Sequence, residues 1–593
     1  MKKTFLFCFI FTILLSCKNS ENKNSEKSEF NFLSGTTWLD TEGKPIEAHG
    51  GGILLHEGTY YWYGENHALG KGNKTGVSCY SSKDLKEWKN EGVVLPKDSL
   101  PIYYRDSGVC ERPKVIFNEA TRKFVMWMHL DAEDYTHAFA GIAVADGPAS
   151  KFKFVKSMRP LKFDYKSSES GDRIAKMNEK GLGNTLRDMN LFVDKDQKAY
   201  IIYASENNVS LYIARLNREY TDVERPDIEG KTWIRALPFQ MREAPAPFKY
   251  NGKYYMITSG LTGWLPNPAQ MHIADSMLGS WKTLGNPCIG PLADMTFNSQ
   301  STFVLHAPGQ KENCFIFMAD RWHGNDLQKS SFVWLPFVIQ PEGNFVIQYL
   351  DQWNFDVFES SFTELEAPIL DPIKSCSGEL TNSYKLVWKK VKAACNYSVL
   401  QNGKTIHTTT KTEIEIRREL AGRAYNYSVI ANNLSGGTSK PSDPVTLKWC
   451  KASEIYLSET EPDFWKQGWG LLQYNKPIED GKITIVDKKF EKGLGTHAPS
   501  EIVYFLNGHY EEFQCYVGVD AFPAFSDKSL VEFLVYVDGK LAFQSGLMNV
   551  KSPSKLCKIK VTKANILKLI ATDGGNGQDW DHANWAEAKL TTK

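Results

Sequence analysis

The chain has 593 residues, more than one hydrophobic core can support, and this length predicts about three or four domains. Its 70 Lys and Arg residues nearly balance its 69 Asp and Glu residues, so no strong field favours nucleic acid or an anionic membrane surface. We therefore expect an uncharged ligand and no nucleic-acid partner. Aromatic residues make up 13% of the chain, which suits both β-sheet cores and the stacking of rings on such a ligand.

The first 17 residues have the order of an export signal. Two lysines precede an apolar run from Phe5 to Leu15, which is too short to span a bilayer, and Cys17 follows Leu-Leu-Ser. This resembles a bacterial lipoprotein signal, which implies that Cys17 carries the lipid. Residues 18–33 are polar and low in complexity, as in a tether. We expect an exported lipoprotein, in the periplasm or on the outer membrane or cell surface, that contacts membrane only through its lipid.

Between residues 50 and 320 one pattern occurs five times, as a turn followed by a short aromatic or aliphatic run. The runs are "EGTYYWYG", "TRKFVMWMH", "DQKAYIIYA", "NGKYYMITS" and "KENCFIFMA", spaced 55 to 75 residues apart. Most are followed by another strand-like stretch, and helical periodicity is nowhere sustained. Small sheets repeated around a channel form a β-propeller. We predict an all-β chain whose residues 34–364 form a five-bladed β-propeller.

A short motif with a polar head precedes each run by ten to fourteen residues. The motifs are "AHGGGIL", "CERPKVIF", "LRDMNLFV", "REAPAPFK" and "NSQSTFVL". In a propeller these would be the innermost strands, whose starts converge on the channel. The sequence therefore predicts one pocket that brings together His49 or Gly50, Glu111, Asp188, Glu243 and Gln300.

The glycine run Gly50–Gly52 is part of neither an esterase motif nor a phosphate-binding motif. An esterase would need G-x-S-x-G, and a phosphate site would need G-x-x-x-x-G-K-[ST] or G-x-G-x-x-G; none of these three patterns occurs. Clustered carboxylates instead suit glycoside hydrolysis, in which one carboxylic acid of raised pKa protonates the leaving oxygen. The charge of Asp188 would raise the pKa of Glu243, so Glu243 is the expected acid.

Together the motifs resemble glycoside hydrolase family 43, specifically its exo-β-1,3-galactanase branch, over roughly residues 35 to 360. The resemblance implies an inverting five-bladed propeller in which Asp188 tunes the acid Glu243. The general-base Asp common on the first blade is replaced here by glycine. In the galactanase branch a fifth-blade glutamine is proposed to stand in, which points to Gln300, with Glu111 as the rival.

The same resemblance implies further site residues. Catalysis would need no cofactor, although some members hold a calcium or other ion in the channel, so a structural calcium ion is compatible with the resemblance. Trp264 is the expected stacking platform for a sugar. The implied sugar contacts are Glu65, Tyr135, Asn207, Thr262, Trp264 and Asp320.

Two further β-sandwich modules are expected after the propeller. Residues 365–449 alternate strands with Gly and Pro turns and resemble a fibronectin type III domain. Residues 453–593 contain "KGLGTHA", "VYVDGK" and "DHANWAEA", which resemble the NPCBM domain, carbohydrate-binding module family 51. His497 and Trp580 are the candidate ligand contacts. The stretch "TDGGNGQDWDH" fits a calcium loop or a tight turn equally.

The sequence thus predicts an exo-acting enzyme that removes galactose from β-1,3-galactan, the arabinogalactan main chain. One alternative keeps the fold and changes the sugar, giving an α-L-arabinofuranosidase or a β-xylosidase. Another is a catalytically inactive surface protein that binds glycans. The sequence gives no prediction of the oligomeric state.

Overall fold

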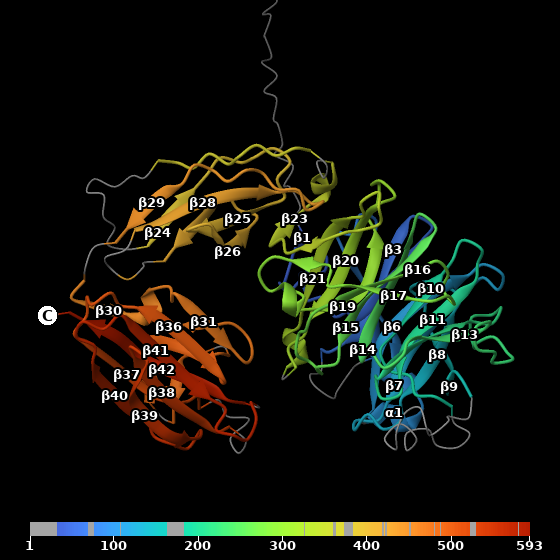
Figure 1. Cartoon of the computed structure of the whole chain (residues 1–593). Coiled ribbons are helices and arrows are strands. Elements are labelled where there is room, and N and C mark those ends of the chain that lie inside the picture. The colour runs from blue at the N-terminus through green and yellow to red at the C-terminus, as the bar shows by residue number, and fades with distance from the viewer. Residues whose placement is uncertain are drawn as a thin grey trace, which may run out of the picture.

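The computed structural model describes residues 32–68, 76–106, 108–162, 183–324, 326–359, 363–372, 383–417, 420, 424–449, 452–479, 481–486, 488–521, 529–578 and 580–592. The expected signal, Cys17 and most of the tether lie outside the described residues. Within these ranges no helix is both long and apolar enough to cross a membrane. Figure 1 shows a propeller in blue to yellow-green, a small sandwich in yellow to orange and a larger one in orange to red.

The described part of the chain before residue 340 contains five antiparallel sheets, each made of strands consecutive in sequence. The first two are β2 (His49–His56), β3 (Thr59–Asn66), β4 (Gly76–Ser82) and β5 (Lys89–Pro96), then β6 (Val109–Asn118), β7 (Lys123–Asp131), β8 (Phe139–Ala145) and β9 (Lys153–Met158). The next two are β10 (Met189–Val193), β11 (Ala199–Ser205), β12 (Ser210–Arg215) and β13 (Trp233–Leu237), then β14 (Arg242–Tyr250), β15 (Lys253–Gly260), β16 (Gln270–Ala274) and β17 (Lys282–Gly285). The last is β19 (Gln300–His306), β20 (Cys314–Arg321) and β21 (Ser331–Val338).

The five sheets close into a ring. Their first strands β2, β6, β10, β14 and β19 contact one another in that order, and β19 contacts β2. The two ends of this part of the chain also meet, because β1 (Phe32–Leu33) pairs with β23 (Gln352–Trp353) and Thr36 bridges to Phe332 of β21. The predicted five-bladed propeller is confirmed, with the five aromatic runs as the second strand of each blade (Figure 1).

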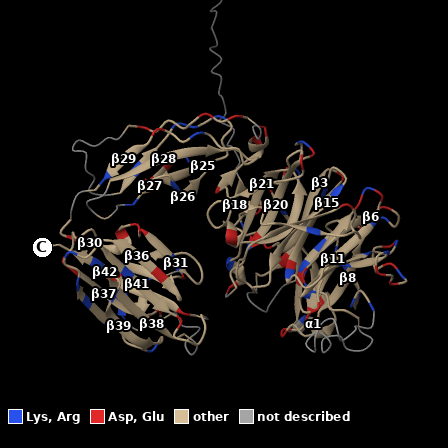
Figure 2. Ribbon diagram, viewed as in Figure 1, with Lys and Arg blue, Asp and Glu red and all other residues tan. Residues whose placement is uncertain are grey.

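Short elements complete the propeller. They are α1 (Ile102–Asp106), the parallel pair β18 (Cys288–Ile289) and β22 (Ile347–Gln348), and 3-10 turns at Lys97–Ser99, Ala293–Met295, Leu327–Lys329 and Phe355–Phe358. Most aromatic residues fill the cores between blades, as Trp62 and Trp334 do with ring centroids 4.9 Å apart. Acidic and basic residues are interspersed over all three bodies, as the near-neutral composition predicts (Figure 2).

Four of the five inner strands carry a β-bulge at the same place. The pairing register shifts between His49 and Gly52, between Glu111 and Lys114, between Glu243 and Ala246, and between Ser301 and Phe303. The residue after the head is left-handed in three of them, with φ of +57° at Gly50, +52° at Arg112 and +50° at Ala244. Because a bulge turns side chains away from the strand's regular alternation, it sets which groups face the axis.

Each glycine of the run Gly50–Gly52 is required by a different neighbour. A Cβ on Gly50 would lie 2.3 Å from Oε1 of Glu65, and one on Gly51 would lie 1.9 Å from the carbonyl oxygen of Tyr63. A Cβ on Gly52 would lie 2.7 Å from Cδ of Lys114. The run therefore lets β2 pass closer to β3 and β6 than any side chain would allow.

The second body is a sandwich of two sheets. One contains β24 (Tyr384–Val387) and β27 (Glu413–Ile416), and the other has the order β26 (Lys404–Thr409), β25 (Asn396–Gln401), β28 (Ala424–Asn432) and β29 (Val445–Lys448). Its core contains Trp388, Tyr397 and Tyr427. The Gln348 side chain joins it to the propeller, since Oε1 accepts from Asn396 Nδ2 at 3.0 Å and Nε2 donates to the Asn433 carbonyl at 2.9 Å.

The third body is a larger sandwich. One sheet contains β32 (Gln473–Tyr474), β35 (Gly493–His497), β42 (His582–Thr591), β37 (Glu512–Val519) and β40 (Lys555–Lys560), with β30 (Glu454–Tyr456) paired to β42. The facing sheet contains β31 (Phe464–Gln467), β36 (Ser500–Phe505), β41 (Ile566–Thr572), β38 (Val531–Val537) and β39 (Lys540–Met548). A hairpin of β33 (Ile483–Ile485) and β34 (Lys488–Phe490) and a 3-10 turn at Leu457–Glu459 complete it. Both sandwiches agree with the predicted all-β class.

The close approach at Gly51 gives a stability prediction. Gly51→Ala should cost more than about 4 kcal/mol, because the new Cβ would overlap a backbone carbonyl that cannot move without opening the β2–β3 pair. Gly58→Ala is the matched control, since Gly58 has φ +70° in the turn of the same hairpin with nothing within 4 Å of a Cβ, and should cost only about 1 kcal/mol. Calorimetric unfolding of the propeller compares the two; equal small shifts would contradict the close approach.

Candidate active site

A pocket of about 270 Å³ lies where the inner strands begin. It brings together four of the predicted heads, Glu111, Asp188, Glu243 and Gln300, from four different blades. Three predicted sugar contacts also line it, namely Glu65, Tyr135 and Trp264. The convergence expected from the repeated motif is therefore present in the structure.

Arg112, which the sequence reading missed, is the central group of this pocket. Its guanidinium spans Asp188, with Nε 3.1 Å from Oδ1 and Nη2 2.9 Å from Oδ2, and Nη2 also donates to Oε1 of Gln300. Burial alone would lower the pKa of Arg112. The nearby carboxylates outweigh burial and raise this pKa, and Asp188 makes the largest contribution among them. Arg112 is thus a permanent buried cation that links the second, third and fifth blades.

Glu243 is held in the state that a general acid needs. One oxygen accepts from Gln300 Nε2 at 2.9 Å and the other from Asn208 Nδ2 at 3.2 Å. Burial, followed by the charge of Asp188, raises the pKa of Glu243 to about 8, although Arg112 opposes the shift. Glu243 therefore keeps its proton at neutral pH while lining the pocket.

Gln300 has every polar atom of its amide engaged. Its carbonyl oxygen accepts from Arg112 and, at 2.9 Å, from Nε1 of Trp322, while its nitrogen donates to Glu243 and to Oγ of Ser259 at 3.2 Å. An inverting pair usually stands about 6.5–9.5 Å apart to admit a water. At 2.9 Å no water fits between the Gln300 nitrogen and the Glu243 oxygen, so the amide directly orients the Glu243 carboxyl group.

Glu111 is arranged differently. One of its oxygens accepts from Oη of Tyr135 at 2.6 Å, and the other faces Nδ1 of His129 at 3.2 Å. The opposite ring nitrogen of His129 lies 2.9 Å from Asp131. Burial alone would lower the pKa of His129, but hydrogen bonds to Asp131 and Glu111 raise it to about 9. Glu111 is thus a carboxylate paired with an imidazolium at the pocket wall.

The first blade supplies its carboxylate from β3 and not from β2. Glu65 accepts the Arg112 backbone N–H at 2.9 Å and pairs with Nε2 of His67 at 3.0 Å. His49 sits at the same bulge position as Glu111 and Glu243, yet its ring turns to Asp320, 3.0 Å away. Neither His49 nor Gly50 lines the pocket, so the expected first-blade head is absent from it.

Three other implied sugar contacts lie outside the pocket wall. Asp320 is buried behind it, where it accepts the Gly50 N–H at 2.7 Å. Asn208, not its neighbour Asn207, lines the pocket, because both have left-handed φ and the turn presents the second amide to Glu243. The Thr262 hydroxyl donates to the Leu265 carbonyl at 2.6 Å within its own exposed loop.

Trp264 and Trp322 form an aromatic corner at the pocket. Trp264 is 36% exposed, and its ring meets that of Trp322 edge to face with centroids 5.3 Å apart. Sequence reasoning missed Trp322, along with His129, Arg187 and Asn208, which also line the pocket. Arg112 carried a usable signal, as an arginine directly after the head in "CERPKVIF".

The third body gathers aromatic and imidazole rings around the two candidate residues named from sequence. Trp469 lies edge-on to buried His497 at 5.5 Å and parallel to His582 at 6.3 Å, and Trp580 lies 6.2 Å from His582. Burial, followed by the charge of His497, lowers the pKa of His582 to about 4, so its ring is neutral at physiological pH. Trp469 and His582 were not identified from sequence.

Among the residues that the structure describes, no group of three or more His, Cys, Asp or Glu side chains is arranged to hold a metal ion. A structural calcium ion, which the resemblance allows, is neither supported nor excluded by this observation.

The model of Glycosyl hydrolases family 43 matches residues 51–290, and that of the NPCBM/NEW2 domain matches residues 453–591. A solved GH43 β-1,3-galactosidase with galactodeoxynojirimycin is 42% identical, with a TM-score of 0.50, covering 55% of this chain and 100% of that one. A solved CBM51 from Clostridium perfringens GH95 in complex with methyl-galactose is 36% identical, with a TM-score of 0.23, covering 23% of this chain and 99% of that one.

A curated protein of Renibacterium salmoninarum, named "Putative endo-alpha-N-acetylgalactosaminidase", is 26% identical over 136 residues, which are 21% of this chain. The chain spans 8% of the length of that relative. The match along the whole of the solved β-1,3-galactosidase is the decisive comparison: this chain belongs to glycoside hydrolase family 43, and its residues 453–591 form an NPCBM/NEW2 domain.

Proposed function

We propose that the protein is an inverting exo-β-1,3-galactanase that releases galactose from β-1,3-galactan. The observation that carries the proposal is Glu243, a buried carboxylic acid whose pKa is raised to about 8 inside a pocket with an aromatic corner. The sugar is supported by the 42% identical relative, whose name gives it as a β-1,3-galactosidase. The small pocket suits the terminal residue of a chain.

The proposed reaction uses two carboxyl groups. Glu243 donates its proton to the glycosidic oxygen as the bond from that oxygen to the anomeric carbon breaks. A water attacks the same carbon from the opposite face, and Glu111 accepts its proton. We assign this role to Glu111 because it is a carboxylate at the pocket wall, whereas the Gln300 oxygen is occupied by two donors. Asp188 raises the pKa of Glu243 and Arg112 lowers it, so the two charges together tune the acid.

The NPCBM/NEW2 domain is proposed to bind galactose-containing glycan, with the rings of Trp469, His497 and Trp580 as its contact surface. Anchoring at Cys17 and export are part of the same proposal and rest on the first 17 residues alone. Such an anchor would hold the enzyme at a surface where insoluble polysaccharide is available.

Substrate and acid are tested together. The purified chain should release galactose, first as the α-anomer, from linear β-1,3-galactan and none from arabinan or xylan. Glu243→Gln should lower kcat by about 10²–10⁴, because the amide cannot donate the proton. Exposed Glu312→Gln is the matched control and should keep full activity. Release of a pentose would favour an α-L-arabinofuranosidase or a β-xylosidase. Binding of a polysaccharide without release of any sugar would favour a catalytically inactive glycan-binding protein.

The pH dependence tests how the acid is tuned. Activity should fall as the pH rises past about 8, because Glu243 then loses the proton it must donate. Asp188→Asn should move this limit to lower pH, since the charge that raises the pKa of Glu243 is gone. The measurement is kcat/KM against pH for both proteins. An unchanged limit in Asp188→Asn would contradict the assigned tuning.

Small anions distinguish the two candidates for activating water. Glu111→Ala should lose turnover by about 10²–10⁴, and azide should restore it with formation of α-galactosyl azide, because an anion needs no base. Gln300→Ala should also be slower, since Glu243 loses a donor, but azide should not rescue it. Rescue of Gln300→Ala in place of Glu111→Ala would reverse the assignment.

A further inference from the structure

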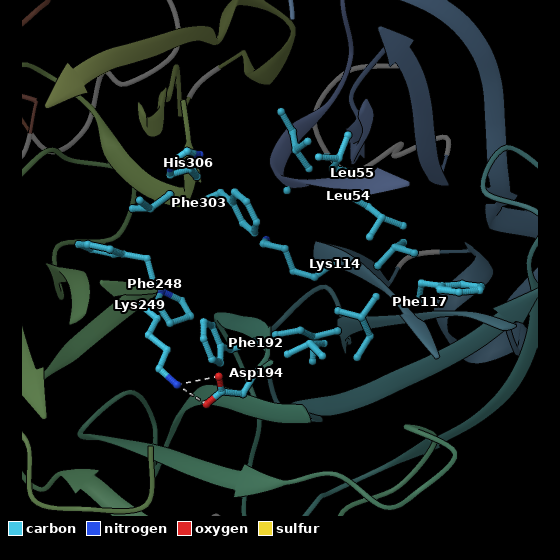
Figure 3. A pocket seen from close by; sticks show the side chains of 18 of the residues that line it. Leu54, Leu55, Lys114, Phe117, Phe192, Asp194, Phe248, Lys249, Phe303 and His306 are labelled. Carbon is cyan, nitrogen blue, oxygen red and sulfur yellow. Dashed lines mark hydrogen bonds and ion pairs between the residues drawn. The ribbon is translucent and has the colours of Figure 1, made fainter. Parts of the chain in front are cut away.

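Lys114 lies on the propeller axis between two cavities. The later residues of the inner strands line a second cavity of about 510 Å³, at the opposite end of the axis from the pocket. Figure 3 shows Lys114 in its middle, between Phe303 and the side chains of β2. Lys114 is only 2% exposed, and its Nζ donates to the carbonyl oxygens of Gly50 at 2.7 Å and Arg112 at 3.4 Å. These two residues are the left-handed positions of the bulges on β2 and β6.

We propose that Lys114 is a positioning residue for the active site: by holding the Gly50 and Arg112 carbonyls, its side-chain nitrogen fixes the bulges that aim Arg112 at Asp188 and Gln300. The inference rests on the proposed function for its kinetic consequence, but not for its structural one.

Both bulge residues are held at their other end by buried carboxylates. The Gly50 N–H donates to Asp320 at 2.7 Å, and the Arg112 N–H donates to Glu65 at 2.9 Å. A left-handed conformation is unfavourable at a residue that carries a side chain, so Arg112 needs contacts that hold its backbone in place. Lys114 donates to the carbonyl oxygens of the same two residues, so one side chain fixes the bulges of both strands.

The sequence makes room for this contact. The Lys114 stem passes where a side chain at position 52 would be, because a Cβ on Gly52 would lie 2.7 Å from its Cδ and 3.0 Å from Phe303. If Lys114 only filled the channel, the aliphatic part of its side chain would be sufficient. A methionine, unbranched and of similar length, therefore separates the two roles, since it keeps the packing and removes the donor.

The charge of Lys114 changes in the working range of the enzyme. Burial and the neighbouring Arg112 lower the pKa of Lys114 to about 7, while Glu65, Asp188 and Asp320 oppose the shift. Its hold on the two carbonyls therefore weakens as the pH rises past 7. In the wild type a first, partial decline in activity should accompany this ionisation, before the larger loss that follows the ionisation of Glu243 past about pH 8.

The test compares full-length Lys114→Met with Lys249→Met. Lys249 lines the same second cavity but pairs with Asp194 at 2.7 Å, away from the bulges. On β-1,3-galactotriose, Lys114→Met should lower kcat about 10–100-fold through misplacement of Arg112, with KM within about threefold. Its alkaline limb should lose the earlier ionisation and start near that of Glu243, and Lys249→Met should match the wild type. A Lys114→Met enzyme with wild-type kcat and alkaline limb overturns the proposal.

A crystal structure of Lys114→Met decides the structural claim without any activity. Displacement of the Arg112 guanidinium from Asp188 and Gln300 supports the proposal, and an unmoved Arg112 overturns it. This arm still applies if the wild type releases no sugar, which would instead count against the proposed function. Should the variant not fold, wild-type crystals at pH 6 and pH 9 serve: a longer contact from Nζ to Gly50 at pH 9 supports the proposal, and identical contacts overturn it.

Discussion

The active site depends on one buried cation held by a strained backbone. Arg112 has a left-handed backbone, lines the pocket and spans Asp188 while donating to Gln300. A buried guanidinium is tolerated only where carboxylates and acceptors surround it, and breaking such a pair leaves an uncompensated charge. The charge of Arg112 and the carboxylate of Asp188 thus stabilise each other, and changing one alters the electrostatic surroundings of the other.

This pairing makes two similar carboxylates chemically different. Asp188 accepts from both Nε and Nη2 of Arg112, so it is the direct partner of the cation. Glu243 receives only neutral amide donors, from Gln300 and Asn208, and burial dominates its pKa. Asp188 is therefore paired with the cation while Glu243 keeps a proton, which is the asymmetry that an acid-catalysed glycoside cleavage requires.

The repeated pattern of turn and aromatic run was enough to predict the blades, because strand content and spacing are local properties of the sequence. The meeting of Glu111, Asp188, Glu243 and Gln300 followed from blade geometry. The sequence did not predict which individual side chains face the pocket where the local backbone conformation decides the direction of the side chain. The choice between Asn207 and Asn208 depends on three successive left-handed residues, Glu206 to Asn208, and the turn of His49 toward Asp320 depends on a bulge. A sequence alone shows neither.

The surroundings of the glycine run also explain why β2 carries no side chain at position 50. A side chain at position 50 would require moving Oε1 of Glu65, which lies 2.3 Å from where its Cβ would be. That same oxygen accepts the backbone N–H of Arg112, so Glu65 cannot swing away without releasing the bulge on β6. A side chain at position 50 and the Glu65–Arg112 contact therefore compete for the same space. In this protein the first blade contributes a carboxylate to the pocket from its second strand, as Glu65.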